Sequence, residues 1–196
     1  MWFTSSELRR KQLRQYRNMA SNDIYETCIF CLISNDQDKE TQVIKKNEEL
    51  VCFRDIYPAA PHHYLVVPIQ HIHSCLSLHS GHIGLVKRMA EMGKTVLHEQ
   101  GVTDMEDIRL GFHQPPFTSV NHLHLHVLAP SSQIFKHMQY KFLPGTLRFV
   151  TEAYLQKHLK DNAPLVISEE SLNQNEPRGN DASCFPGWNT TSMTSF

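Results

Sequence analysis

Residues 122–128 read His-Leu-His-Leu-His-Val-Leu, with a histidine at every second position and an aliphatic residue after each. Successive side chains of a β-strand point to opposite faces, so the alternation predicts a strand with three imidazoles on one face and aliphatic side chains in the core. The alternative is a half-exposed strand that uses histidine for simple solvation. The outer two histidines would lie about 13 Å apart along the strand, whereas zinc binds a histidine nitrogen at about 2.0–2.1 Å. We therefore expect His122, His124 and His126 to have different roles rather than to share one metal.

Around this segment, hydrophobic periodicity predicts an α+β domain with a five-stranded antiparallel sheet. Apolar residues recur at spacings of three and four in residues 80–100, which predicts one long amphipathic helix that ends at Gly101. Thr151 precedes a second such pattern, which predicts an N-cap and a short C-terminal helix. Runs rich in β-branched and aromatic residues predict strands at residues 41–46, 50–55, 63–67, 108–112 and 122–128.

The length and composition of the chain fit one domain with appendages. The chain has 196 residues, 40% of them hydrophobic, which suffices for one sizeable core but not for two ordinary domains. Its 19 Lys and Arg nearly balance its 20 Asp and Glu, so a net charge of −1 creates no overall field that attracts nucleic acid or anionic lipid. We expect neither a membrane span nor a secretory signal, because no apolar run approaches about 20 residues and none follows the basic N-terminus. We therefore expect a cytoplasmic protein, with the nucleus as a further compartment.

Charge divides the chain into three parts. Residues 1–20 carry five basic residues and one acidic residue, whereas residues 161–196 carry one basic residue and five acidic ones. The last segment is rich in Asn, Ser, Thr, Pro and Gly and has no periodicity, so we expect an acidic, disordered tail. We assign residues 21–160 to the folded domain and residues 1–20 to a basic, solvated N-terminal arm.

Cys28 and Cys31 form a Cys-x-x-Cys motif, a pattern typical of metal sites. The chain has five cysteines, an odd number that does not resemble a disulfide framework and that agrees with a reducing compartment. Zinc would need two further ligands, and His71 and His122 are the best candidates for a closed, structural site. A thioredoxin-like redox pair and unliganded buried thiols stay open as alternatives.

The motifs of the chain also occur in a characteristic order. They are residues 28–31 (Cys-Ile-Phe-Cys), 53–56 (Phe-Arg-Asp-Ile), 61–68 (Pro-His-His-Tyr-Leu-Val-Val-Pro), 71–72 (His-Ile) and 122–128. In this order and spacing, the chain from residue 23 to about residue 160 resembles the histidine triad (HIT) superfamily and is identified as a Hint-type member. The resemblance implies a HIT-like fold, a homodimer, and hydrolysis of adenosine 5′-phosphoramidates and acyl adenylates to AMP.

The resemblance also implies roles for individual residues around the reacting phosphate. His124 would be the nucleophile that attacks the α-phosphorus and forms a nucleotidyl-histidine, which water then cleaves. A neutral imidazole is nucleophilic at pH 7 when its other nitrogen donates to a fixed acceptor. His126 would donate a hydrogen bond to phosphate oxygens, and Ser119 would contact the leaving group or a phosphate oxygen. This chemistry requires no catalytic metal and no organic cofactor.

The same resemblance implies a site for the nucleoside. Asp55 would accept hydrogen bonds from both ribose hydroxyls, although a surface carboxylate at a strand end is the alternative. Ile29, Phe30 and Ile33 match the apolar wall on which the purine packs, with ordinary core packing as the alternative. The chain departs from the Gly-rich pattern of the Hint-type branch at residues 115–117 (Pro-Pro-Phe), so we expect a differently shaped leaving-group side.

Two other functions compete with this hydrolase. The first is an aprataxin-like deadenylase that acts on nucleic-acid ends, which would need a basic surface or zinc finger, yet no further Cys/His pairing follows residue 128 and the tail is acidic. The second is a non-catalytic, zinc-stabilised nucleotide-binding module, which would not need three histidines in a row. We therefore expect a purine nucleotide as the partner, and neither a membrane nor nucleic acid.

Overall fold

The computed structural model describes residues 28–161. This part of the chain forms a sheet of six strands, with three helices and four short 3₁₀ turns. The helices are α3 (Ile29–Ser34), α4 (Ile83–Glu99) and α5 (Glu152–Lys160). The strands are β1 (Val43–Lys46), β2 (Leu50–Arg54), β3 (His62–Pro68), β4 (Arg109–His113), β5 (Leu125–Ala129) and β6 (Phe149–Thr151).

All strand pairs are antiparallel, and the sheet has the order β1-β2-β3-β5-β4-β6. Strands β3 and β5 lie in the centre, where the register pairs His126 with Leu65 and His63 with Leu128. Because residues in register share a face of the sheet, the histidine of β5 and the histidine of β3 point to the same side. The motif that suggested the fold therefore lies at the middle of the sheet.

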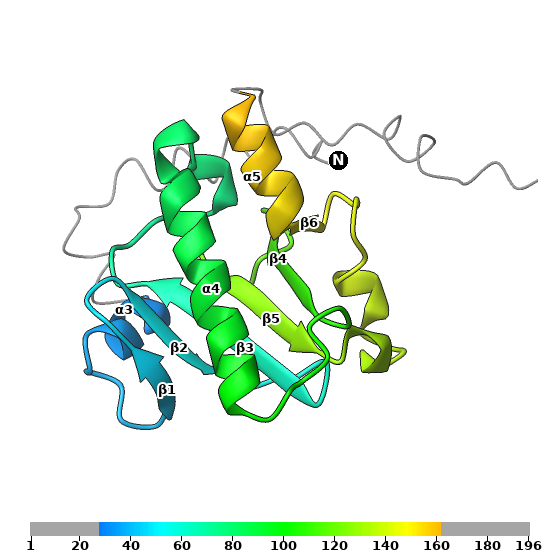
Figure 1. Ribbon diagram of the computed structural model, residues 1–196. Helices are drawn as coiled ribbons and strands as arrows, with labels where there is room; N and C mark the ends of the chain where they lie inside the picture. The colour runs from blue at the N-terminus through cyan, green and yellow to red at the C-terminus, as the bar shows by residue number, and fades with distance from the viewer. Residues whose placement is uncertain (1–27, 162–196) are drawn as a thin grey trace, which may run out of the picture.

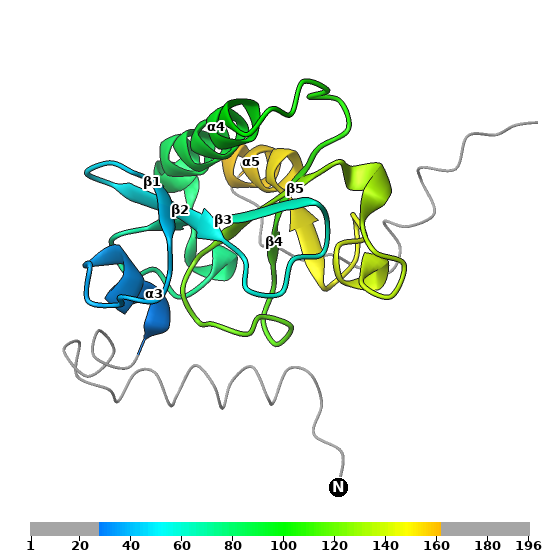
Figure 2. The ribbon, with the colours of Figure 1, turned by 90° about the horizontal axis from the view of Figure 1, so that it is seen from below.

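The helices divide between the two faces of the sheet (Figures 1 and 2). The long helix α4 and the short helix α5 cover one face and pack on a core that includes Leu123, Leu125 and Val127. Helix α3 and the segment between β5 and β6 lie on the other face (Figure 2). Two smaller apolar clusters occupy that second face, one under α3 and one around Phe142. The space between these two clusters is where His63 and His126 emerge from the sheet.

Helix α4 lies directly against β5. A Cβ atom at Gly93 would stand 2.6 Å from a methyl carbon of Val127, so this position of the helix needs a glycine. The contact fixes the strand from the side opposite to His126. The aliphatic half of the alternating segment thus serves to hold its imidazole half in place.

The structure confirms the α+β class, the antiparallel sheet, the long helix and the closing helix. The side chain of Thr151 accepts from the N–H of Tyr154, as expected of an N-cap. The expected five strands are corrected to six, because β6 has only three residues and was too short to give a pattern. The expected strand at residues 122–128 begins at Leu125, so His122 and His124 precede the strand rather than lie in it. The alternation nevertheless persists, because Leu123 is in the α4 core.

The predicted arm at residues 1–20 lies outside the described residues, as does the predicted tail except for Asp161. None of the helices within residues 28–161 is long and apolar enough to cross a membrane.

Candidate active site

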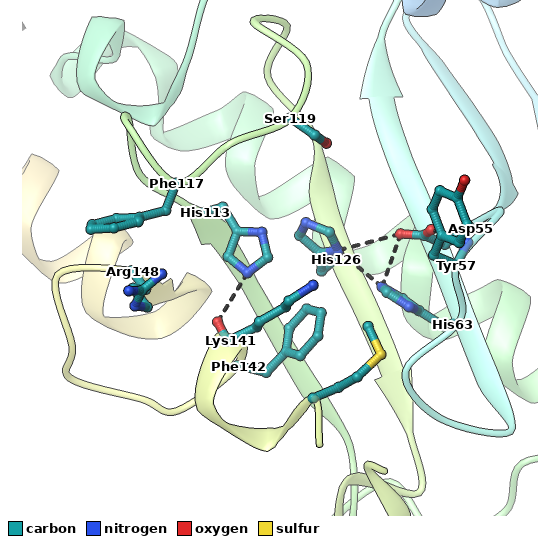
Figure 3. A pocket seen from close by; sticks show the side chains of 11 residues that line it. Asp55, Tyr57, His63, His113, Phe117, Ser119, His126, Lys141, Phe142 and Arg148 are labelled. Atoms are coloured by element: carbon teal, nitrogen blue, oxygen red, sulfur yellow. Dashed lines mark hydrogen bonds and ion pairs between the residues drawn. The ribbon is translucent and has the colours of Figure 1, made fainter. Parts of the chain in front are cut away.

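Hydrogen bonds fix the tautomers of His63 and His126. Nδ1 of His63 accepts the backbone N–H of Ala59 at 3.0 Å, so a neutral His63 carries its proton on Nε2. That Nε2 lies 2.9 Å from Nδ1 of His126 and donates to it, which leaves the proton of a neutral His126 on Nε2. Nε2 of His126 is buried and has no hydrogen-bond partner within residues 28–161. The two rings therefore present one oriented N–H donor that nothing in the described chain satisfies (Figure 3).

His124 is oriented by the backbone directly before β5. Its Nδ1–H donates to the carbonyl of His122 at 2.6 Å, because a carbonyl oxygen can only accept. Nε2 of the neutral ring therefore keeps its lone pair. The rings of Phe30 and His126 meet it edge-on, with centroid separations of 5.2 and 5.0 Å, and 6% of the residue is exposed. His124 thus combines an available lone pair with a dry environment and a fixed orientation.

Burial keeps the imidazoles of this region neutral at pH 7. Burial lowers the pKa of His124 to about 4 and the pKa of His63 to about 3. It also holds the pKa of His126 well below 6.5 and lowers the pKa of His113. Protonating such rings is costly because each would place a charge in a poorly solvated site beside other imidazoles. The tautomers assigned above are therefore those of neutral rings.

Asp55 follows β2 and brings a carboxylate to the same site. Its Oδ1 accepts the N–H of Tyr57 at 2.8 Å, and its Oδ2 lies 3.4 Å from Nε2 of His63 and 3.9 Å from Nδ1 of His126. Burial raises the pKa of Asp55 above its usual value, against the opposing effects of the Tyr57 N–H and Lys141. The carboxylate is thus fixed at one end by the backbone, at the edge of the site (Figure 3).

A cavity of about 240 Å³ opens beside His126 on the second face of the sheet. Asp55 and His63 line one side of it, and Phe117 and Arg148 lie on the opposite side (Figure 3). Ser119 also lines the cavity, from the exposed loop between β4 and β5. His124 is not part of this lining. His126 and Ser119 thus both line the cavity.

Helix α3 supplies the residues that the sequence suggested as a purine wall. Phe30 and Ile33 are buried in the apolar cluster against β2 and β3, so both have core positions. Ile29, at the start of α3, is 42% exposed. Phe30 packs in this core and also lies beside His124, with 5.2 Å between the two ring centroids. Ile33 is accordingly a core residue, which was the alternative interpretation.

The second cluster of the site contains the four predicted metal ligands. Ligand atoms of Cys28, Cys31, His71 and His122 all lie within 4.8 Å of one another. Cys28 caps the N-terminus of α3 and Cys31 lies one helical turn later, so both thiols face the same side. This helix was not predicted, and it explains how a Cys-x-x-Cys motif converges on one point. None of the four described cysteines forms a disulfide.

The geometry of this cluster fits a tetrahedral zinc ion. Nδ1 of His71 lies 3.1 Å from Sγ of Cys31, and Nδ1 of His122 lies 3.5 Å from each of the two sulfur atoms. Zinc–sulfur and zinc–nitrogen bonds of about 2.3 and 2.0–2.1 Å would separate sulfur and nitrogen ligands by about 3.6 Å. Nε2–H of His122 donates to the carbonyl of Pro68 at 2.9 Å, which leaves the Nδ1 lone pair directed at the thiols. The donor set and the tautomer of His122 therefore suit a metal.

The structure brings the predicted residues together in two groups joined by the segment before β5. His122 lies in the cysteine cluster, whereas His126 lies with Asp55. The sequence analysis missed His63, although it forms the hydrogen bonds that orient His126. A usable signal existed, because His63 stands in an expected strand and strands alternate, but its pairing with the strand of His126 could not be read from one sequence.

Comparisons with known proteins identify the family of the chain. A family model described as "Scavenger mRNA decapping enzyme C-term binding" matches residues 27–140. Adenosine 5′-monophosphoramidase HINT3 of Danio rerio is 57% identical over 117 residues, which are 60% of this chain and 73% of that protein. The solved structure "Hnt3 in complex with DNA and guanosine" matches with a TM-score of 0.52 at 21% identity, over 66% of this chain and 75% of that chain, and shows the shared fold alone. The chain belongs to the histidine triad superfamily.

Within the superfamily, the chain is a Hint-type protein of the HINT3 group. Aprataxin of Gallus gallus is more distant, at 36% identity over 63% of this chain and 37% of its own length. The expected family is therefore confirmed, and the relatives favour the HINT3 group over aprataxin.

Proposed function

We propose that this protein is a nucleotide hydrolase that cleaves adenosine 5′-phosphoramidates and acyl-AMP to AMP through a covalent nucleotidyl-histidine on His124. The observation that carries the proposal is the His124 ring, with its Nδ1–H bound to the His122 carbonyl and its Nε2 lone pair available. A protein that only bound nucleotides would gain nothing from a buried, neutral and oriented lone pair. The name of the Danio rerio relative, an adenosine 5′-monophosphoramidase, supports the same reaction.

The reaction divides into two displacements. Nε2 of His124 attacks the α-phosphorus, and the P–N bond breaks as the N–P bond to the histidine forms. The leaving nitrogen takes the electron pair of the broken bond and one proton from the solvent, and departs as the amine. Water then attacks phosphorus, and the bond from phosphorus to Nε2 breaks with its electron pair returning to His124. The hydroxyl of the water stays on phosphorus as part of AMP, and its other proton goes to the solvent. The Nε2–H of His126 donates to the phosphate oxygens as negative charge builds on them, and its fixed tautomer needs no rearrangement.

Recognition of the nucleotide follows from the residues around these two histidines. Asp55 accepts from the ribose hydroxyls with the carboxylate that Tyr57 holds in place. Ile29, which is 42% exposed, and the Phe30 ring beside His124 offer an apolar surface for the purine. Ser119 contacts a phosphate oxygen or the leaving group from its loop.

We also propose that Cys28, Cys31, His71 and His122 hold a structural zinc ion. A closed set of four protein ligands leaves no position for a substrate or water, so the metal would supply folding energy rather than chemistry. Burial raises the pKa of the Cys31 thiol to about 12, and a bound cation would offset this cost by stabilising the thiolate. The cluster connects to the reaction through His122, whose carbonyl orients His124.

The test of the main proposal is a rapid-quench experiment with adenosine 5′-phosphoramidate. We expect release of AMP and a transient protein species heavier by one adenylate in the intact mass spectrum. A parallel reaction with a 5′-adenylated oligonucleotide separates this activity from the aprataxin-like alternative. Efficient turnover of the oligonucleotide with none of the phosphoramidate would show that the proposed substrate class is wrong.

The pH dependence of the reaction should reflect the low pKa of His124. Because burial lowers this pKa to about 4, the nucleophile stays neutral well below pH 6.5. We expect kcat/KM for adenosine 5′-phosphoramidate to stay nearly constant from pH 8 to about pH 5. A steady-state pH profile measures this, and an acid limb with its midpoint near 6.5 would contradict the environment described for His124.

Folding stability sets the lower limit of that profile. The pKa values of His63 and His124 are lowered in the folded state, to about 3 and about 4. Their neutral forms therefore favour the folded state above pH 6.5, and stability is lost as the pH falls from 6.5 through these values, by at most about 1.4 kcal/mol per pH unit for each ring. Circular dichroism at each pH identifies the range in which the rates refer to folded protein.

The homodimer that the family resemblance implies, and the cytoplasmic location, stay predictions. Sedimentation of the purified chain would decide the first and imaging of the tagged protein in cells the second.

A further inference from the structure

The cavity beside His126 extends from Asp55 and His63 on one side to Phe117 and Arg148 on the other. An AMP conjugate whose ribose meets Asp55 and whose phosphorus meets His124 must direct its remaining part away from both. Phe117 and Arg148 lie on the side of the cavity opposite to Asp55, and Ser119 lines the cavity as well (Figure 3). This side of the cavity is therefore where a leaving group would lie.

Two basic side chains line the cavity, Lys141 and Arg148. Neither has a carboxylate within salt-bridge distance among residues 28–161. Asp55 is the acidic residue in the lining, and His63, His113 and His126 are neutral at pH 7 for the reasons given above. At neutral pH the lining thus carries more positive than negative charge, and neither cation forms a salt bridge within residues 28–161.

Arg148 is held at the edge of the cavity by aromatic rings rather than by an acid. Its guanidinium carbon lies 4.1 Å from the centre of the Phe117 ring and 5.7 Å from that of Tyr140. Stacking of this kind orients a guanidinium group while leaving its N–H donors available in the plane. Phe117 belongs to the stretch that departs from the Gly-rich family pattern. The residue that replaces the Gly-rich pattern, Phe117, therefore supplies an aromatic ring on which Arg148 stacks at the leaving-group side.

Lys141 lies on a 3₁₀ turn (Gln139–Lys141) that contacts the histidines of the site. Its backbone carbonyl accepts Nε2–H of His113 at 3.0 Å, and the next residue, Phe142, packs its buried ring 5.3 Å from the ring of His126. The ammonium group extends into the cavity between His113 and His126 (Figure 3). Its positive charge lowers the pKa of Asp55, against the larger effect of burial, which raises it. Lys141 can therefore reach a group bound near the phosphate.

From this arrangement we propose that Lys141 and Arg148 form a subsite that selects leaving groups carrying a negative charge, such as the carboxylate of an amino acid joined to AMP through its amine. The inference rests on the proposed phosphoramidase function and names its substrate class. When the P–N bond breaks, its electron pair and one proton go to the amine nitrogen, and the carboxylate leaves unchanged. The charge thus acts by binding and positioning, and not in the chemical step.

The experiment compares the AMP phosphoramidates of glycine and of glycinamide. The first leaving group carries a carboxylate, and the second carries a neutral amide in its place. The readout is the ratio of their kcat/KM values, since intrinsic leaving-group reactivity cancels when variants are compared with the wild type. We expect Lys141→Gln and Arg148→Gln each to lower this ratio by about tenfold, as for loss of a charge-assisted hydrogen bond. Lys136→Gln is the matched control, because Lys136 is exposed on the same segment and does not line the cavity.

A second measurement does not depend on any variant. In the wild type, raising the salt concentration should lower the glycine-to-glycinamide ratio, because salt screens an exposed charge interaction. If the wild type hydrolyses both conjugates and the ratio changes neither with salt nor in the two variants, the subsite is disproved while the phosphoramidase function stands. If it hydrolyses neither conjugate nor adenosine 5′-phosphoramidate, the proposed function fails and the subsite with it.

Discussion

Replacing His124 with asparagine is expected to lower kcat/KM for adenosine 5′-phosphoramidate by about a thousandfold or more, as for other covalent nucleophiles. Asparagine cannot supply the Nε2 lone pair that the Nδ1–H bond to the His122 carbonyl leaves available. The adenylated species should disappear from the quenched mass spectrum together with the rate. Initial-rate assays and intact-mass analysis of the same samples measure both effects.

The control for this variant is His137→Asn. His137 is exposed and does not line the cavity, so the same chemical change should leave the rate near that of the wild type. An unaltered rate for His124→Asn, in a variant that melts at the wild-type temperature, would remove the nucleophile from the mechanism. A normal rate with no adduct in the wild type would instead point to direct attack by water.

Replacing Cys31 with serine is expected to abolish zinc retention and to lower the free energy of unfolding by several kcal/mol. Cys31 is 1% exposed and its sulfur lies within 3.5 Å of Nδ1 of both His71 and His122, so it is central to the cluster. A structural zinc site supplies on the order of 10 kcal/mol in small zinc domains, and a hydroxyl is a poor replacement for a thiolate ligand. Metal analysis after gel filtration and urea denaturation measure the two effects.

Cys52→Ser separates the metal from the effect of a buried hydroxyl. Cys52 is equally buried but lies in the core under α4, outside the cluster. We expect it to lose stability while its zinc content stays that of the wild type and a chelator still destabilises it. Cys31→Ser should be insensitive to chelator. Equal zinc content in the two variants would show that Cys31 is not a ligand.

The two variants also differ in their expected effect on catalysis. The His122 ring belongs to the metal cluster, and its carbonyl accepts the Nδ1–H of His124. Loosening the cluster should therefore reduce kcat more than KM, because the orientation of the nucleophile is lost while Asp55 and the cavity remain. Cys52→Ser should leave kcat unchanged below its melting temperature.

The sequence predicted the parts of the fold that local periodicity determines. The long helix and five of the strands gave clear patterns, and Thr151 gave a capping signal that the structure confirms. Strand β6 could not be predicted, because three residues give no alternation and its place in the sheet comes from pairing with β4. Helix α3 was missed for a similar reason, since its six residues are stabilised by packing on β2 and β3.

At the site, the sequence predicted the identity of the residues more successfully than their orientation. The grouping of Cys28 and Cys31 with His71 and His122 was predicted from ligand chemistry, and the structure places these residues together. The hydrogen bond between His63 and His126 depends on the register of β3 against β5, which a single sequence does not reveal. Lys141 and Arg148 were missed because they lie in the connection between β5 and β6, where no periodic pattern singles out a side chain.

The close spacing along residues 122–128 limits how this protein can change over evolution. One side chain of the segment belongs to the cysteine cluster, one carries the proposed nucleophile, one lines the cavity, and those between fill the core under α4. An insertion or deletion of a single residue would exchange the two faces, turning leucines towards the nucleotide and imidazoles into the hydrocarbon interior. The segment can therefore diverge by exchange of side chains, whereas its length is fixed.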